Sequence, residues 1–204
     1  MLNELKEKNG ILVQGYIKIF DPESGNIIVD KRNAIHYENM SIALAKSIGN
    51  SGSGWIYEMS FGNGGTSVDP TGIITYLTPN NTGVNASLYN ETFTKIVDDR
   101  SVNNNDPLRN KIETRHVSGT NYTDVLITCL LDYGEPAGQD AFDNATDANS
   151  LYVFDELGLK EWNSTGTGNL LTHVIFHPVQ KSLNRLIQID YTVRVQSLSS
   201  VMEG

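Results

Sequence analysis

The chain has a single cysteine, Cys129, and four histidines, and this scarcity limits the sites that it can build. One thiol forms no intramolecular disulfide, and it supplies no thiolate cluster for a structural zinc ion. Cys129 lies inside the apolar stretch VLITCLL, where we expect a buried, unreactive thiol. Long apolar runs are missing as well. None approaches the roughly 20 residues of a membrane-spanning helix, so we expect no membrane segment and no membrane partner.

Positive charge is also in short supply, with 15 Lys and Arg against 24 Asp and Glu and a formal net charge of -9. Nucleic-acid binding needs a basic surface, and an anionic membrane attracts basic segments, so we expect neither partner. Charged residues are only 19% of the chain, and Asn, Thr, Ser and Gly take their place, which is typical of a loop-rich β protein. The N-terminal MLNELKEKNG lacks the apolar core of a signal peptide, which predicts a chain made in the cytoplasm.

Alternating apolar residues predict strands along much of the chain. Examples are ILVQGYIKIF, WIYEMSF, YTDVLITCLLDY and RLIQIDYTVRVQ, and turn formers such as DPESGN and SGTN separate such runs. ILVQGYIKIF and IIVD flank DPESGN, so we expect them to form a hairpin. In RLIQIDYTVRVQ the apolar side chains from Ile187 to Val195 share one face, and Arg194 lies on the other, which faces water or a partner.

One stretch, NAIHYENMSIALAKSIGN, has the apolar spacing of a helix. We expect a short α-helix over about residues 38–49, because Asn33 or Asn39 can cap its start and Gly49 with Asn50 can end it.

The whole pattern predicts a mainly β protein, a β-sandwich or jelly roll in a single domain with one short α-helix. That domain is expected at residues 11–204, after a flexible lead at residues 1–10. Two polar segments without periodicity, residues 98–110 and 135–150, are expected to be long loops, and loops of this length are often functional.

The glycine-rich segment MSFGNGGTSVDPTG invites comparison with phosphate-binding loops. Such loops need a helix directly after the glycines or a Gly-Lys-Ser/Thr sequence, because backbone N–H groups at the helix start bind the phosphate. Pro70 and Gly72 break any helix here, and Gly-Lys-Ser/Thr is absent from the sequence. We therefore interpret Gly62, Gly64 and Gly65 as a structural turn or bulge, with positive φ as the reason for glycine.

The strand predicted at LLTHVIFHPV carries a histidine pair. Pro178 is expected to end this strand, and Gly158 to bend the strand LYVFDELGLK before it. His173 and His177 share a face, but their Cα atoms are about 13 Å apart in an extended chain, too far to share a metal ion. Nucleophile-elbow and calcium-loop patterns are absent, so we predict no catalytic, cofactor-binding or metal-binding residue. An enzyme of another kind stays open as an alternative, and it requires a concave pocket with convergent acids or histidines.

Three stretches, MSFGNGG with the following TYLTPNN, VFDELGLK, and LLTHVIFHPVQKSLNRLIQIDYTVRV, together resemble structural proteins of tailed bacteriophages, in the neck, collar, tail and fibre-base group. The shared scheme runs from a Phe-Gly-x-Gly turn through the pairing segment LYNETFTKIV and a Glu-x-Gly-Leu strand to a hairpin that ends in a long strand. The matching residues are Phe61, Gly62, Gly64, Glu156, Gly158, Leu159, Leu171, Pro178, Lys181 and Arg185. The resemblance spans roughly residues 55–195, and residues 140–150 look like an insertion.

The resemblance implies a non-enzymatic virion component, without a cofactor, that assembles as a homo-oligomer and binds other phage virion proteins. The two long loops are expected to bury against adjacent subunits, and the final strand to pair at its edge with a neighbouring sheet. The residues predicted at such contacts are Asp99, Arg100, Arg109, Asp140, Asp143, Trp162 and Arg194. The alternative function is recognition of a host-surface glycan, for which Trp162, beside the flexible NSTGTG, is the aromatic most expected to be exposed.

Overall fold

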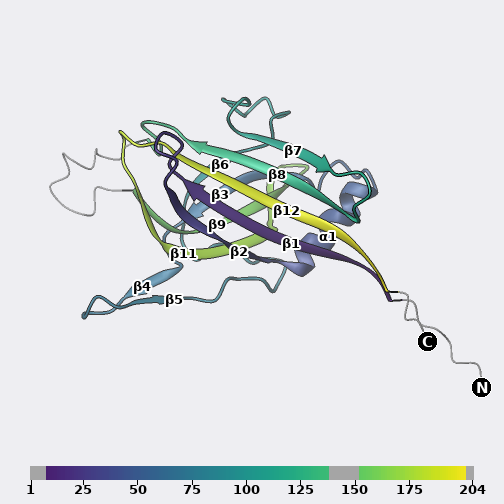
Figure 1. Ribbon diagram of the computed structural model, residues 1–204, viewed down its shortest axis with the longest axis horizontal. Helices are drawn as coiled ribbons and strands as arrows, with labels where there is room; N and C mark the ends of the chain where they lie inside the picture. The colour runs from purple at the N-terminus through teal and green to yellow at the C-terminus, as the bar shows by residue number, and fades with distance from the viewer. Residues whose placement is uncertain (1–7, 138–151, 201–204) are drawn as a thin grey trace, which may run out of the picture.

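A computed structural model describes residues 8–137 and 152–200, and it shows a mainly β chain (Figure 1). The described strands are β1 (Lys8–Phe20), β2 (Ile27–Ile35), β3 (Ile56–Gly62), β4 (Thr66–Val68), β5 (Ile74–Tyr76), β6 (Glu91–Ile96), β7 (Lys111–His116), β8 (Tyr122–Leu131), β9 (Tyr152–Asn163), β10 (Gly166–Leu170), β11 (Thr172–Lys181) and β12 (Ile187–Ser200). The described part of the chain contains a single helix, α1 (Tyr37–Ile48), between β2 and β3. Within these residues, no helix has both the length and the apolar character needed to cross a membrane.

Most of the strands form one antiparallel sheet that curls on itself. Its hydrogen-bonded order is β6-β3-β9-β11-β2-β1-β12-β8-β7, and β10 pairs with β9. Figure 1 shows β1, β12 and β8 across the near side of the molecule and β3 and β9 behind them. β2 links the two layers, because it pairs with β1 along most of its length while its last residues, Ala34 and Ile35, pair with β11. The predicted mainly β, sandwich-like single domain with one short helix is confirmed.

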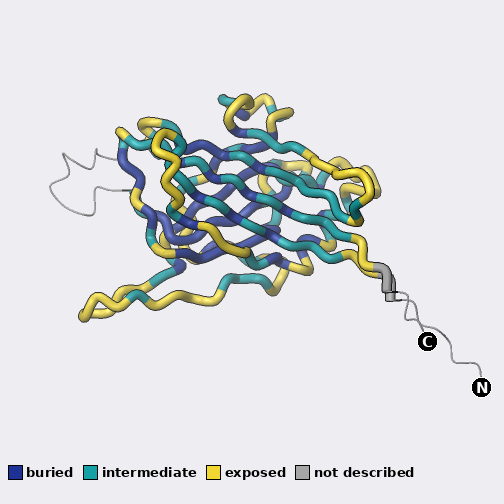
Figure 2. Tube along the Cα trace, viewed as in Figure 1, coloured by how far each residue is buried: buried dark blue, intermediate teal, exposed yellow. Residues whose placement is uncertain are grey.

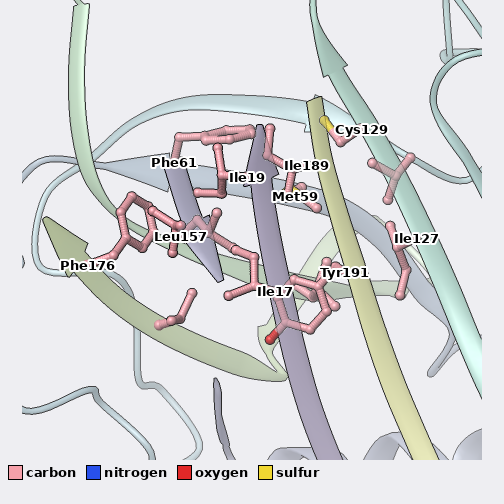
Figure 3. Close-up of a cluster of buried hydrophobic side chains, with 14 of the residues drawn as sticks. Ile17, Ile19, Met59, Phe61, Ile127, Cys129, Leu157, Phe176, Ile189 and Tyr191 are labelled. Atoms are coloured by element: carbon pink, nitrogen blue, oxygen red, sulfur yellow. The ribbon is translucent and has the colours of Figure 1, made fainter. Parts of the chain in front are cut away.

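The core lies between these two layers. Alternate residues of β1 and β12, such as Ile17 and Tyr191, point inward and meet Met59 and Phe61 of β3 and Leu157 of β9 (Figure 3). The alternation predicted for the final strand is confirmed, since its apolar residues from position 187 to 193 are buried and its polar ones are half-exposed. Such alternation is what a sheet with one face on the core requires.

Cys129 is part of this core, as expected from its apolar surroundings. Burial raises the pKa of its thiol to about 12. The side chain is therefore a neutral apolar group at physiological pH.

The helix begins one residue earlier than expected and has a different cap. His36 is the capping residue, and its Nδ1 accepts a hydrogen bond from the Asn39 backbone N–H at 3.2 Å. Both predicted caps are wrong, because Asn33 belongs to β2, where it lies opposite Gly15, and Asn39 lies inside the helix. Gly49 ends the helix as predicted, and its N–H donates to the Ala45 carbonyl.

Four boundaries differ from the prediction. β1 already begins at Lys8, so the end of the expected flexible lead belongs to a strand. β4 and β10 are short strands that the sequence pattern does not predict. Pro178 does not end β11, which continues to Lys181. The β9 pairing shifts register between Ile175 and Val179, and a proline without an N–H is tolerated at such an irregularity.

Candidate functional site

The feature that stands out from the body of the molecule is a hairpin made of β4 and β5, residues 66–77, called the arm below. It projects from the body in Figure 1 and is exposed along most of its length in Figure 2. It also carries large apolar side chains on its surface, namely Val68, Ile73, Tyr76 and Leu77. Val68 and Ile73 are each 63% exposed, and Asp69 is the only charged residue of the arm. An apolar, nearly uncharged projection is a surface suited to a partner.

The tip of the arm is a fixed turn. The Asp69 carboxylate accepts hydrogen bonds from Thr71 N at 2.8 Å, Thr71 Oγ1 at 2.7 Å and Ile73 N at 2.9 Å. The side-chain bond from Thr71 and the backbone bonds lower the pKa of Asp69. Gly72 follows with a φ of 87°, a conformation that glycine adopts without strain. The tip is therefore held in one shape before any partner arrives.

The root of the arm is held by two consecutive carboxylates of β9. Asp155 accepts from Gly65 N at 2.9 Å, from Thr66 N at 2.9 Å and also from the Thr66 hydroxyl. Glu156 accepts from Gly64 N at 3.1 Å. The glycine-rich turn thus uses its backbone N–H groups to bind anions, as phosphate loops do, but the anions are carboxylates of the chain itself.

Glu156 also holds the chain where it returns from the arm. Its carboxylate accepts from Tyr89 N at 3.0 Å and Asn90 N at 2.8 Å, and His173 Nε2 lies 2.9 Å away. His173 Nδ1 accepts from Asn80 N at 2.7 Å, so the ring proton is assigned to Nε2, which donates to Glu156. Burial acts to raise the pKa of Glu156, but the bonds from His173 and the backbone N–H groups outweigh it and lower the pKa.

This buried pair resembles the histidine and carboxylate of a catalytic triad, but its geometry is structural. Both ring nitrogens of His173 already have partners, and both side chains are shielded from solvent. A general base must reach a proton on a substrate or a nucleophile. His173 and Glu156 instead fasten β9 and β11 to the segment that carries the arm.

The glycines of this region are needed for a reason other than the predicted one. Their φ angles lie outside the left-handed region, so the expectation of positive φ is wrong. A Cβ on Gly62 would lie 2.5 Å from the Asn90 carbonyl oxygen, and one on Gly64 would lie 2.7 Å from Tyr89 Cβ. Neighbouring segments approach the backbone here too closely for any side chain. Close approach, and not positive φ, is therefore the reason for glycine at these positions.

A pocket of about 390 Å³ opens at the end of the sandwich beside α1, and it is called the end pocket below. α1 contributes Met40 and Ala43 to its lining, and the facing strands contribute Ile112, Val125 and Val193 among others. Several of these side chains belong to the hydrophobic core, so the pocket is an unfilled extension of that core. Apolar hollows of this size are typical binding sites.

The rim of the end pocket brings together two of the predicted contact residues, Asp99 and Arg100. Arg100 Nε donates to Asp98 Oδ1 at 2.9 Å, and this bond raises the pKa of Arg100. Trp55 Nε1 donates to the other oxygen of Asp98 at 2.9 Å, and the Arg100 guanidinium lies 5.7 Å from the centre of the Trp55 ring. Arg100 at the rim is thus paired with Asp98, and Asp99 beside it is exposed to solvent.

Trp162 lies behind this rim. Its ring stacks on Trp55 with centroids 6.2 Å apart and packs against Tyr57 at 4.7 Å. The side chain is half-buried, so it is less exposed than the glycan-binding alternative requires.

The other predicted contact residues lie elsewhere. Arg109 pairs with Asp106 and Asp132. Arg194 binds Asp124 through two nitrogens, at 2.8 and 2.9 Å, on the outer face of the near layer. The remaining pair, Asp140 and Asp143, lies outside the described residues.

The predicted edge pairing by the final strand is wrong. β12 lies between β1 and β8 and is hydrogen-bonded on both sides. It therefore has no free edge for a neighbouring sheet along these pairings.

The arm was missed as a functional element, although its sequence carries a signal. Asp-Pro-Thr-Gly between TSV and IITYL is a turn flanked by β-branched residues, which is typical of a hairpin. Its projection could not be read from this pattern, because a strand pair next to the body and one away from it share the same local sequence preferences.

Across residues 8–137 and 152–200, His, Cys, Asp and Glu side chains do not gather in a group of three or more that could hold a metal ion. No protein-family model, no curated protein and no solved structure matches the chain.

Proposed function

We propose that this protein is a non-enzymatic structural subunit of a tailed-bacteriophage virion, made in the host cytoplasm and assembled as a homo-oligomer in the neck, collar or tail. The observation that carries the proposal is the arm, a projecting hairpin on which Val68, Ile73, Tyr76 and Leu77 are exposed to water. Moving such side chains out of water is the main driving force of protein association.

The anchoring of the arm supports the same proposal. Its tip is fixed by Asp69 and its root by Asp155 and Glu156, so both ends are held by carboxylates of the chain. A partner segment that is ordered in advance loses less conformational entropy on binding. A hairpin built in this way is suited to docking, whereas a hairpin that only connects two strands does not need such anchors.

The competing functions gain less from the geometry. The His173 and Glu156 side chains are buried and bonded to the arm segment, so they offer no general base to a substrate. Trp162 packs on Trp55 and Tyr57, whereas a sugar ring needs an aromatic face that is free.

The test is the mass of the purified protein in solution, measured by size-exclusion chromatography with light scattering. We expect the wild-type chain to form a defined multiple of 22.5 kDa and Ile73→Asp to be a monomer. Ile73→Leu is the matched control, because it keeps an apolar side chain at the same exposed position and should keep the assembly. A wild-type chain that stays monomeric at its highest soluble concentration, or an Ile73→Asp chain that assembles normally, contradicts the proposal.

A further inference from the structure

We propose that the arm of one copy binds in the end pocket of the next copy, so that subunits join head to tail. This inference rests on the proposed function, and it names the surface that receives the arm. The occupant of the end pocket is thus a second copy of this chain.

The two surfaces match in chemistry. The arm has one charged residue, Asp69, among residues 66–77, and its exposed side chains include Val68 and Ile73. The end pocket is lined mainly by aliphatic side chains, the Arg100 charge at its rim is already paired with Asp98, and Asp99, the other charged residue of the lining, is exposed to solvent. A charged ligand would find no free countercharge in Arg100, whereas a nearly uncharged hairpin needs none.

The pocket also has the size to hold side chains from the arm. An engineered cavity of about 150 Å³ holds a benzene molecule. The end pocket, at about 390 Å³, has room for more than one aliphatic side chain. Val68 and Ile73 flank the turn at the tip, so they are the side chains that a docking arm presents first.

The positions of the two surfaces set the symmetry. Figure 1 shows the arm extending toward one end of the molecule, while α1, which lines the end pocket, lies toward the other end. A rigid arm therefore reaches the pocket of another copy and not its own. Because the two surfaces differ, the contact is heterologous, and it builds either a closed ring or an open filament.

A mixing experiment tests this contact. Ile73→Asp spoils the arm and leaves the pocket intact, and Thr114→Arg places a charged side chain at an exposed position of the pocket lining and leaves the arm intact. We expect each variant alone to be a monomer. An equal mixture should give a particle of twice 22.5 kDa that grows no further, because one sound arm meets one sound pocket. Thr94→Arg, at an exposed threonine of β6 outside the pocket, is the matched control and should assemble like the wild type.

The outcomes separate this inference from the proposed function. If the wild type assembles and Thr114→Arg does too, or if the mixture stays monomeric, the arm docks elsewhere and the inference is overturned while assembly stands. If the wild type never assembles, the proposed function fails. A small apolar molecule is the other candidate occupant of the end pocket. Titration of the wild type with the neutral fluorescent probe N-phenyl-1-naphthylamine tests for it. Probe binding that saturates without weakening assembly identifies a small-molecule pocket and also overturns the inference.

Discussion

Individual buried charges in this protein serve as anchors, and their partners decide whether they stabilise the fold. Glu156 and His173 are fully buried, and they bond to each other and to four backbone N–H groups. Glu161, also buried, pairs with Lys46 at 3.0 Å. Lys181 differs, because in the described chain its buried ammonium makes one hydrogen bond, to the Ser182 carbonyl at 2.8 Å. Replacing a buried charge that has several charged or hydrogen-bonded partners should lower stability, whereas replacing one with a single neutral partner should raise it.

Replacing Glu156 tests the first case. Glu156→Gln places an amide N–H₂ against groups that already donate, such as Tyr89 N, Asn90 N and His173 Nε2, so we expect the free energy of unfolding to fall by about 3 kcal/mol. Because the pKa of Glu156 is lowered, its stabilisation is present above the ordinary glutamate pKa of 4.5 and is lost as pH falls through the lowered value. Urea unfolding at neutral and acid pH measures both effects.

The control is Glu113→Gln on the surface of β7, which should change the unfolding free energy by less than about 0.5 kcal/mol. Equal effects of the two substitutions would contradict the anchoring role. The anchoring role would also be contradicted if the difference in unfolding free energy between wild type and Glu156→Gln did not shrink at acid pH.

Replacing Lys181 tests the second case. Burial lowers its pKa from 10.5 to about 8, with Lys95 and Arg185 acting in the same direction and Glu135 and Asp132 against it. Between pH 8 and 10.5 the unfolded chain holds the proton more tightly, so this lysine costs most stability below pH 8 and less as pH rises. We expect Lys181→Met to raise the free energy of unfolding at pH 7 by about 2 kcal/mol.

Urea unfolding of both chains at pH 7 and pH 9.5 isolates this lysine, because all other titrating groups are shared. The gain should shrink at the higher pH. Lys111→Met, at a half-exposed position of β7, should change the unfolding free energy little at either pH. A Lys181→Met chain that is less stable than the wild type at pH 7 would show that the ammonium is a needed donor.

At the scale of elements, close backbone approach fixes where β9 can pass. Gly158 pairs with Ser60 of β3, and a Cβ at this position would lie 2.4 Å from the Thr172 carbonyl oxygen and 2.6 Å from Leu170 Cδ1. Backbone atoms cannot give way as a flexible side chain can. We expect Gly158→Ala to lower the free energy of unfolding by about 3 kcal/mol, as measured by thermal or urea unfolding.

Gly10→Ala is the matched control for this strand glycine, because a Cβ there meets no atom within 4 Å and its φ lies outside the left-handed region. It should leave stability unchanged or slightly raised. A Gly158→Ala chain as stable as Gly10→Ala would mean that β9 and β11 can separate locally at little cost.

Elements with a regular pattern could be predicted, and those set by distant contacts could not. The hairpin of β1 and β2 and the alternation of β12 follow from local periodicity, because one face of each strand meets the core. The helix cap at His36 was missed because Asn33, the better local candidate, is used by β2. β4 and β10 are too short for a period to emerge.

The candidate site shows the same division. Asp99 and Arg100 were selected as loop residues, and the structure places both at the rim of the end pocket. Their neighbours in the pocket come from α1, β7 and β12, which lie far apart in the sequence, so the pocket itself has no local signature. The carboxylates that hold the arm, Asp155 and Glu156, lie about 90 residues after the glycines they bind.

At the scale of the whole molecule, the proposed contact surfaces lie at the two ends and not along the sheet. β12 is hydrogen-bonded on both sides. On the outer face of the near layer, charged side chains form ion pairs such as Arg194 with Asp124. The ends instead offer the apolar arm and the apolar end pocket. A molecule whose contact surfaces are confined to opposite ends assembles in one dimension, as the subunits of a ring or a filament do.

The net negative charge of each copy opposes assembly, and added salt should weaken this repulsion. Each copy carries a formal charge of -9, so copies repel one another until counterions screen the charge. Raising the salt concentration from about 0.01 M to about 0.1 M shortens the screening length from about 30 Å to about 10 Å. Because the proposed contact is apolar, screening removes repulsion without weakening the contact. We expect the assembled fraction, measured by light scattering, to rise with salt, and Ile73→Leu to follow the same curve. Assembly that weakens with salt would point to ion pairs between subunits and would contradict an apolar arm contact as the main source of affinity.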